Sequence, residues 1–378
     1  MADVLIWADS IRSPEIRHEV PVAVPDPFLY AEHDGKRRTV VTSFELERVT
    51  GLGTDLEVLP FEEFGIDQLY AQGMAREQID LELVLRAARR FGIEQAVVPA
   101  TFPLAFADYL REHGVGVEAD YEFFVRRRRV KNDAELAGIR RAQRGAEAGM
   151  NAARELLRRA EATNGTLTVD GEPLTCERLR LEVERAFSAH GVAAEEFIVS
   201  HGPQTAIGHE MGHGPVAPGE PVLLDLFPRD RGSGCYADMT RVFVVGTPPD
   251  ELVEYQRLCR EARDRAVEAI KPGAVGRDLH RMTCELFQEH GYPTQLSKKP
   301  GEVLDNGFFH SLGQGVGLEV HEQPWLGRDS SELVAGDVVA VEPGLYRAGF
   351  GGCRLEDLVL VTEDGAEVLT DFPYELEP

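Results

Sequence analysis

Four acidic residues in the second half of the sequence follow one spacing rule. In each of two copies, an acid stands six positions after a turn glycine, and a second acid follows 13 or 14 positions later. The acids are Asp225 and Asp238 in the first copy, and Glu342 and Glu356 in the second. Each borders a short apolar run, so the pattern predicts a repeat of two strand pairs. A pseudo-twofold axis between the copies would bring the four carboxylates together.

Such a group of acids has a chemical consequence. Four carboxylates at the ends of buried strands repel one another, and burial makes their charged forms still less favourable. The usual compensation is one or two divalent cations held between the carboxylates. The alternative is four separate surface acids of an acidic protein, but the repeated spacing beside apolar strands favours a shared site. The sequence therefore predicts a metal site made by these four residues.

A glycine-rich stretch at 309–324 adds further candidates. It contains His310 and His321, and its three glycines allow the backbone to pass close to another group. The apolar alternation from Val316 to Val320 predicts a short strand just before His321. We expect this stretch to converge with the two acidic copies.

Five fragments of the sequence together resemble the pita-bread metallopeptidases. This group contains methionine aminopeptidase, aminopeptidase P, prolidase (Xaa-Pro dipeptidase) and the metal-free relative creatinase. The fragments, in the order of the family, are Leu-Leu-Asp-Leu-Phe-Pro-Arg, Tyr-Ala-Asp-Met-Thr-Arg, His-Ser-Leu-Gly-Gln-Gly-Val-Gly-Leu-Glu-Val-His-Glu, Val-Glu-Pro-Gly-Leu-Tyr and Arg-Leu-Glu-Asp. With the amino-terminal half, the resemblance covers nearly the whole chain. It implies an α/β (α+β) fold in which a pita-bread catalytic domain with an internal pseudo-twofold repeat follows a smaller creatinase-type α/β domain.

The resemblance also implies roles for the acids. Asp238 and Glu356 match acids that bridge two metal ions, and Asp225 matches an acid that chelates one metal alone. Glu342 matches the acid that orients the attacking water and helps to bind the other metal. Two divalent metal ions are therefore expected. Manganese is favoured, with cobalt, zinc and magnesium as alternatives.

Several basic side chains have counterparts in the same family. His209 and His321 match histidines that touch the substrate or move protons, and Arg354 matches an arginine beside the last metal ligand. His213 lies four residues after His209 and is a candidate for substrate binding, although a plain loop histidine is an equal alternative. His310 is a second candidate for substrate binding.

One position departs from the pattern of the family. The family has Gly-His-Gly where this sequence has Gly313-Gln314-Gly315, and the offset of seven from Gln314 to His321 shows that the register is unchanged. Losing this imidazole ligand should cost at least about 10–100-fold in metal affinity, which is the cost of losing the hydrogen bonds that support such a ligand. The remaining ligand set is all oxygen, which favours manganese or magnesium over zinc. His310 could take the place of the missing histidine if its loop moved.

The length, charge and cysteines of the chain restrict the classes of protein to which it can belong. The 378 residues predict two domains, at 1–128 and 129–378. Forty basic against 65 acidic residues give a net charge of −25, which disfavours nucleic acid and anionic membranes as partners. Five scattered cysteines without a Cys-x-x-Cys pair fit a reducing cytosol. We see neither a signal peptide nor an apolar run of about 18 residues, so we expect a cytoplasmic protein.

Local patterns predict the remaining elements. In the first domain, Thr42 and Glu45 are expected to cap a helix that follows a strand at 39–42. The basic run 126–131 is expected to be a hinge strand that pairs with the acidic body, rather than a nucleic-acid patch. Helices are expected at 74–91, 104–112, 132–161, 176–190, 251–270 and 276–290.

The activity that the resemblance implies is metal-assisted hydrolysis of Xaa-Pro peptide bonds, as in prolidase or aminopeptidase P. Glu342 would take a proton from the attacking water, and His209 or His321 would help to stabilise the tetrahedral oxyanion. The Leu-Phe-Pro-Arg stretch after Asp225 and the amino-terminal domain favour prolidase-like members, and they leave both dipeptides and longer proline-containing peptides open as substrates. A homodimer is expected, because the amino-terminal domain of such relatives covers the site of a partner subunit.

Two other functions remain open at this point. One is a metal-poor hydrolase of the creatinase type with His209 as its base, which Gln314 favours and the four retained acids oppose. The other is a binding protein on the same fold without catalysis; the charge of −25 opposes a nucleic-acid version of it.

Overall fold

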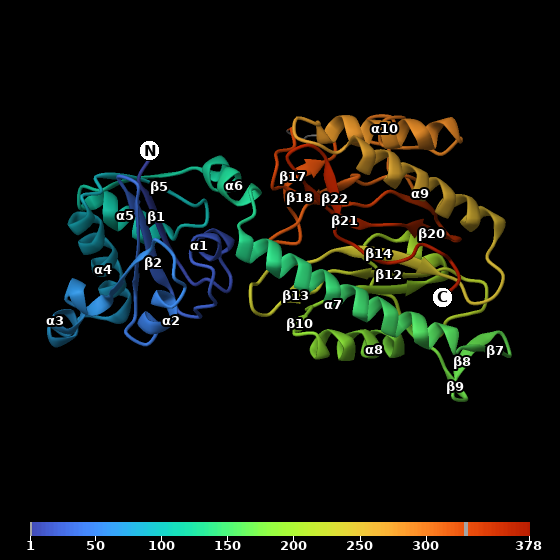
Figure 1. The fold of residues 1–378 in the computed structure, drawn as a ribbon, viewed down its shortest axis with the longest axis horizontal. Helices are drawn as coiled ribbons and strands as arrows, with labels where there is room; N and C mark the ends of the chain where they lie inside the picture. The colour runs from blue at the N-terminus through green and yellow to red at the C-terminus, as the bar shows by residue number, and fades with distance from the viewer. Residues whose placement is uncertain (1, 329–331) are drawn as a thin grey trace. The chain divides into compact units, whose positions relative to one another are not determined.

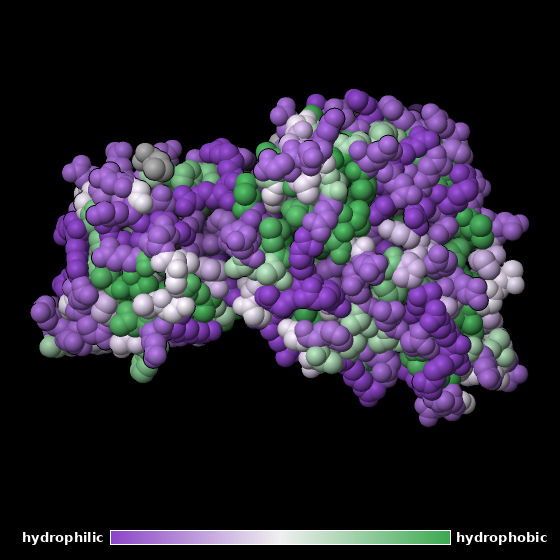
Figure 2. Space-filling model, in the orientation of Figure 1, coloured by the Kyte–Doolittle hydropathy of each residue, from purple (hydrophilic) through white to green (hydrophobic). Residues whose placement is uncertain are grey.

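The structure is a computed structural model that describes residues 2–328 and 332–378. The chain separates into two compact units, with the boundary between Arg128 and Arg129. None of the helices in the described part combines the length and the apolar character that a membrane crossing requires. On the face drawn in Figure 2, hydrophilic residues cover most of each unit, and smaller apolar patches lie among these residues.

The first unit is a mixed sheet with helices packed against it. Its elements are β1 (Val4–Ala8), α1 (Pro14–Glu19), β2 (Phe28–His33), β3 (Lys36–Val41), α2 (Leu46–Thr50), β4 (Glu57–Pro60), η1 (Phe61–Phe64), α3 (Ile66–Ala71), α4 (Arg76–Phe91), β5 (Gln95–Val98), α5 (Leu104–Glu112), β6 (Gly116–Ala119) and α6 (Tyr121–Arg129). The strand order is β4-β3-β2-β1-β5-β6. β1 pairs antiparallel with β2 and parallel with β5. Trp7 in the core stacks on Phe61 and Phe106, so aromatic packing joins the sheet to its covering segments.

Helices α4 and α5 confirm the predictions for 74–91 and 104–112. Gly92 ends α4 in the left-handed conformation, with φ of 81°, as a glycine after a helix often does. The predicted cap by Thr42 is wrong, because α2 begins only after Glu45 and no side chain caps it. The carbonyl of Thr42 instead accepts a hydrogen bond from the backbone N–H of Glu45 at 3.0 Å, so a turn separates the strand from the helix.

The basic run 126–131 is not the hinge strand that we expected. Helix α6 continues through it to Arg129. The arginines of this run instead pair through their side chains: the guanidinium of Arg127 lies 2.7 Å from Glu19 and 2.8 Å from Glu32 within the first unit. A helix satisfies these partners because it directs successive arginines to different sides.

The second unit consists of two similar halves. The elements of the first half are α7 (Asp133–Arg158), β7 (Glu161–Thr163), β8 (Thr166–Val169), β9 (Glu172–Pro173), α8 (Cys176–Ala189), β10 (Val192–Ala193), β11 (Ile198–His201), η2 (Gly202–Ala206), β12 (Val222–Leu226), β13 (Arg229–Asp230) and β14 (Met239–Phe243). The elements of the second half are α9 (Asp250–Ala269), α10 (Gly276–Glu289), β15 (Asn306–Gly307), β16 (Gly313–Gly315), β17 (Glu322–Leu326), β18 (Val338–Val341), β19 (Gly344–Arg347), β20 (Gly351–Arg354), β21 (Asp357–Val361) and β22 (Ala366–Val368).

The helix pairs enclose the strands of this unit. Figure 1 shows α7 and α8 on one side of the strands, and α9 and α10 on the other. The four helices confirm the helices predicted at 132–161, 176–190, 251–270 and 276–290, and Asn132 and Glu135 form a capping box at the start of α7. A helix pair therefore precedes each hairpin that carries the acids.

The two halves meet at the ends of the strands that carry the acids. β12 pairs antiparallel with β14, and β18 pairs antiparallel with β21. Asp225 lies in β12 and Asp238 directly precedes β14, whereas Glu342 directly follows β18 and Glu356 directly precedes β21. The backbone N–H of Glu356 donates a hydrogen bond to the carbonyl of Thr240 at 3.2 Å, which joins the halves. The pseudo-twofold repeat expected from the spacing is present.

The strand predicted from Val316 to Val320 is wrong. The strand in this stretch is β16, which ends at Gly315, and the chain then bends until β17 begins. The N–H of Gly317 donates to the carbonyl of Glu319 at 3.0 Å, so the alternating apolar residues belong to a tight turn. The close backbone approach expected of the glycines is observed, since a Cβ on Gly313 would collide with the carbonyl oxygen of Ala340.

Candidate active site

Three of the predicted acids form a tight, buried group. Carboxylate oxygens of Asp225, Asp238 and Glu356 all lie within 4.8 Å of one another. Glu342 lines the same pocket, which has a volume of about 480 Å³, and its carboxylate lies 4.0 Å from Nε of Arg354. The fold therefore brings together four residues that are separated by up to 131 positions in the sequence.

Burial and mutual repulsion make this group of carboxylates costly to ionise in the protein alone. Burial raises the pKa of Asp238 well above its ordinary value, and the charges of Glu356 and Asp225 raise it further. The pKa of Glu356 rises in the same way, through burial and then through Glu342 and Asp225. Burial is also the main cause that raises the pKa of Glu342 to about 7. Full ionisation of the group thus calls for a cation.

The carboxylates fit a divalent cation. Oδ1 of Asp225 is buried and has no hydrogen-bond partner among the described residues, whereas its Oδ2 accepts a hydrogen bond from Arg354. A buried carboxylate oxygen without a donor is unfavourable unless a cation or water binds it. The donor set of Asp225, Asp238, Glu342 and Glu356 is made of hard oxygen atoms, which suits manganese or magnesium.

Arg354 holds the acids in place. Its Nη2 donates to Asp225, its Nε donates to Oγ1 of Thr240 at 3.1 Å, and its Nη1 donates to the hydroxyl of Tyr346 at 3.3 Å. Thr240 in turn donates from Oγ1 to a carboxylate oxygen of Glu356 at 2.6 Å. Sequence reasoning gave no role to Thr240 or Tyr346, although both lie inside fragments that carried the resemblance.

Gln314 lies where the sequence placed it, inside the group of acids. Its side chain is buried, and its Nε2 donates a hydrogen bond to Oδ2 of Asp238 at 3.1 Å. In this orientation the amide is a hydrogen-bond donor to an acid rather than a metal ligand. A half-turn of the amide would present its oxygen instead.

His310 contacts the acids from the glycine-rich stretch. Its Nδ1 donates to the carbonyl of Ser311 at 2.8 Å and lies 3.7 Å from the carboxylate of Glu342. Its Nε2 accepts from the hydroxyl of Tyr346 at 2.9 Å. Burial, with the charge of Arg354, lowers the pKa of His310 to about 3, so this imidazole is neutral. It therefore orients the hydroxyl of Tyr346.

The other three predicted histidines, unlike the half-buried His310, are exposed to solvent. His209 and His321 line the pocket, and both are exposed to solvent. Burial, followed by the nearby His209, lowers the pKa of His321. The structure does not bring His213 into the pocket: its side chain is 73% exposed, and its Nδ1 lies 3.6 Å from Glu210. The turn around Gly212 and Gly214, both with positive φ, directs this loop histidine outwards.

Apolar side chains form much of the remaining lining of the pocket, and no role in the site was predicted for any of them from the sequence. They come from β11, the loop after η2, β12 and the residue that follows it, and the glycine-rich stretch. These side chains are Ile198, Ile207, Met211, Leu223, Phe227, Phe309 and Val320. A pocket with one acidic and one apolar wall suits a substrate that has an apolar part beside the reacting bond.

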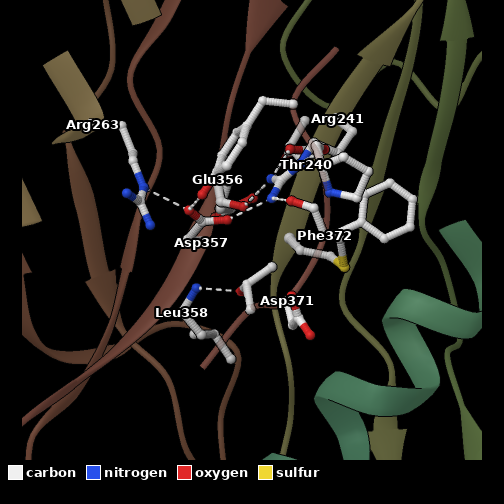
Figure 3. A network of polar contacts seen from close by, with 12 residues as sticks. Thr240, Arg241, Arg263, Glu356, Asp357, Leu358, Asp371 and Phe372 are labelled. Atoms are coloured by element: carbon white, nitrogen blue, oxygen red, sulfur yellow. Dashed lines mark hydrogen bonds and ion pairs between the residues drawn. The ribbon is translucent and has the colours of Figure 1, made fainter. Parts of the chain in front are cut away.

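A buried network of ion pairs supports the backbone of the acids from behind (Figure 3). Asp357 directly follows Glu356 and accepts hydrogen bonds from Arg241 Nη2 at 2.7 Å and from Arg263 Nε at 2.6 Å. Arg241 Nη1 also donates to the backbone carbonyls of Thr240 at 2.9 Å and Glu356 at 2.8 Å. The guanidinium of Arg241 thus joins the backbones of the two halves next to the acids.

The C-terminal segment completes this network. Arg241 donates from Nη2 to the carbonyl of Phe372 at 3.0 Å and from Nε to the carbonyl of Pro373 at 2.9 Å. The hydroxyl of Tyr374 donates to Asp357 at 2.6 Å. Because these groups are buried and satisfied, removing one partner leaves the others buried and unpaired.

We predict that Arg241→Met lowers the free energy of unfolding by about 3 kcal/mol, the cost of breaking a buried ion pair from one side. Arg140→Met is the matched control, because Arg140 pairs with Glu367 on the surface and both side chains are 40% or more exposed. Its cost should stay within about 1 kcal/mol. Urea unfolding of the two variants measures both values, and equal losses would contradict the structural role of Arg241.

We also predict that the metal-free protein loses stability as the pH rises. The pKa of Glu342 is about 7 in the folded protein against an ordinary value of 4.5. Between these values the folded state holds a proton that the unfolded state has released, so the free energy of unfolding falls with rising pH. Asp238 and Glu356 shift in the same direction, and Arg354 opposes them.

Chemical unfolding of EDTA-treated protein from about pH 5 to about pH 8 measures this dependence. Excess manganese should flatten the slope by stabilising the ionised acids, and Glu342→Gln should reduce it by removing one of them. A stability that rises with pH across this window in the metal-free protein would contradict the proposed coupling between the acids.

Comparison with known proteins agrees with this geometry. A model of metallopeptidase family M24 matches residues 137–363. The Xaa-Pro dipeptidase of Pyrococcus furiosus is 36% identical over 203 residues, which make up 52% of this chain and 53% of that protein. The probable dipeptidase PepE of Mycobacterium tuberculosis is 30% identical over 286 residues, or 74% of this chain and 68% of that protein. The match thus spans only about half the length of the first relative.

Solved structures share the fold over almost the whole chain. The Xaa-Pro dipeptidase from Bacillus anthracis aligns with a TM-score of 0.78 at 23% identity, and the alignment covers 100% of this chain and 94% of that one. The prolidase from Pyrococcus furiosus aligns with a TM-score of 0.73 at 25% identity, covering 99% and 97%. These likenesses confirm the expected pita-bread fold. The family model matches more than half of the residues of this chain. Together with these solved structures, that match shows that the chain belongs to metallopeptidase family M24.

Proposed function

We propose that this protein is a metal-dependent peptidase that hydrolyses Xaa-Pro peptide bonds. The observation that carries the proposal is the buried group of Asp225, Asp238 and Glu356, with Glu342 in the same pocket. Membership of a metallopeptidase family supports the reaction class, and relatives named Xaa-Pro dipeptidase support the choice of bond.

The four acids would hold two divalent cations. Asp238 and Glu356 would bridge the two, Asp225 would bind one of them, and Glu342 the other, with Gln314 as a neutral neighbour. When bound, the cations would supply an activated water and polarise the scissile carbonyl. The oxygen-only donor set favours manganese over zinc or cobalt.

The side chains around the acids would complete the reaction. Glu342 would take the proton of the attacking water; its carboxylate lies 4.0 Å from Nε of Arg354 and 3.7 Å from Nδ1 of His310. His209 or His321, at the exposed part of the pocket, would stabilise the oxyanion of the tetrahedral intermediate. The proton must then reach the nitrogen of the proline ring, which leaves as an amine.

The setting of the reaction belongs to the same proposal. We infer a cytoplasmic homodimer without a nucleic-acid or membrane partner. The charge of −25 supports the lack of polyanionic partners, and the five free, buried cysteines are compatible with a reducing compartment. Light scattering of the purified protein would measure the oligomeric state.

A metal-poor hydrolase of the creatinase type is the second candidate. The hydrogen bond from Gln314 to Asp238 favours it, because the amide stabilises an ionised Asp238 without a cation. His209 would then serve as the base at the mouth of the pocket. The buried Oδ1 of Asp225, which has no hydrogen-bond partner in the described part of the chain, favours the metal-dependent reaction instead.

Hydrolysis of alanyl-prolyl peptides after EDTA treatment distinguishes the two candidates. We expect no activity without metal and recovery with manganese, and we expect Asp238→Asn to lose at least about 100-fold in kcat/KM. Asp364→Asn, at an exposed position, is the control for the substitution itself. Full activity in EDTA would favour the creatinase-type mechanism.

Gln314→His should raise the affinity for manganese by about 10–100-fold, because it adds an imidazole ligand at the position where the family has one. Isothermal titration with manganese measures the affinity directly, without reference to activity. Gln72→His, on the exposed surface of the first unit, controls for an added imidazole. An unchanged affinity in Gln314→His would mean that this position does not face the metal.

A further inference from the structure

The charged side chains that line the pocket are mostly acidic. Besides the four carboxylates of the proposed metal site, Glu196 lines the pocket from the segment before β11, where it is exposed to solvent. Among the described residues of the lining, Arg354 is the one arginine, and no lysine accompanies it. A negatively charged group on a substrate would therefore meet few cationic side chains.

The guanidinium of Arg354 already donates hydrogen bonds to Asp225 and to the residues beside the acids. Its three nitrogens donate to Asp225, to Thr240 at 3.1 Å and to Tyr346 at 3.3 Å, and its side chain is 11% exposed. Turning this guanidinium towards a substrate would leave the buried Asp225 carboxylate without its partner. Such a loss costs more than an exposed ion pair returns.

The histidines of the pocket are also poor partners for a substrate carboxylate. Both ring nitrogens of His310 have partners, the carbonyl of Ser311 at 2.8 Å and the hydroxyl of Tyr346 at 2.9 Å. His209 and His321 remain, and both are exposed to solvent, which weakens any ion pair that they could make. A substrate carboxylate in this pocket would therefore have at best a partner whose charge is screened by solvent.

The small number of cationic partners in the pocket matters because an Xaa-Pro dipeptide carries a carboxylate close to its scissile bond. Its carboxylate is attached to the proline Cα, which is bonded to the nitrogen that leaves. With the scissile bond at the acids, that carboxylate must enter the same pocket. Burying a carboxylate without a full positive partner is costly, and like charge at Glu196 adds to the cost. An amide in the same place is neutral.

We propose that the pocket selects oligopeptides that continue beyond the proline, with a neutral or basic residue next, and discriminates against free Xaa-Pro dipeptides. The inference rests on the proposed Xaa-Pro hydrolysis and names its substrate class. The apolar wall with Ile198 and Phe227 would contact the proline ring, and Glu196, two positions before Ile198, would face the residue that follows. The chain would thus act as an aminopeptidase, unlike relatives that are named dipeptidases.

The test compares Ala-Pro with its amide, Ala-Pro-NH2, on the manganese-loaded protein. The two differ only in the charge at the proline carboxyl. We expect kcat/KM to be about tenfold or more higher for the amide. Equal or faster cleavage of the free dipeptide would overturn the inference while leaving Xaa-Pro hydrolysis intact. Cleavage of neither would contradict the proposed function itself, and the inference with it.

Two variants test the electrostatic cause through the ratio of the two rates. Glu196→Gln should narrow the preference for the amide by about two- to fivefold, the size expected for an exposed charge. Ile207→Arg places a cation in the pocket at a side chain that is 60% exposed, so the fold should tolerate it, and it should narrow the ratio at least as much. Ile207→Gln is its neutral control. An unchanged ratio in both charge variants would overturn the inference.

Discussion

The repulsion among four buried carboxylates is the constraint on which this structure depends. Asp225, Asp238 and Glu356 place oxygens within 4.8 Å of one another, and Glu342 shares their pocket. Without a cation, the protein meets this cost by holding protons, as the raised pKa of Glu342, Asp238 and Glu356 indicates. Only a positive charge at the centre would let all four ionise, so the same arrangement that destabilises the metal-free protein would bind metal.

The rest of the second unit serves to maintain that unfavourable arrangement. The repeat brings two hairpins together, and Arg241 clamps the backbone of Thr240 and Glu356 from behind. Arg354 secures Asp225 from the pocket side. Gln314 changes the balance of charge within the group, because its neutral amide donates a hydrogen bond to Asp238 at 3.1 Å.

The acids could be predicted from the sequence because strand ends and turn glycines fix their positions, and a repeated spacing is visible without coordinates. Thr240 and Tyr346 could not, because a hydroxyl in a strand gains its role only from partners more than a hundred positions away or across a hairpin. The alternation before His321 misled, since buried residues in a tight turn can alternate as a strand does. The position of His213 depends on an irregular loop, and the spacing of residues in the sequence does not predict the conformation of such a loop.

Metal stoichiometry tests the account most directly. The protein would be stripped with EDTA, incubated with excess manganese, desalted and measured by elemental analysis beside Asp238→Asn. The account predicts one or two manganese ions per chain in the unaltered protein and a loss of metal in the variant. No bound metal in the folded, unaltered protein would contradict it, and the four carboxylates would then need another source of positive charge.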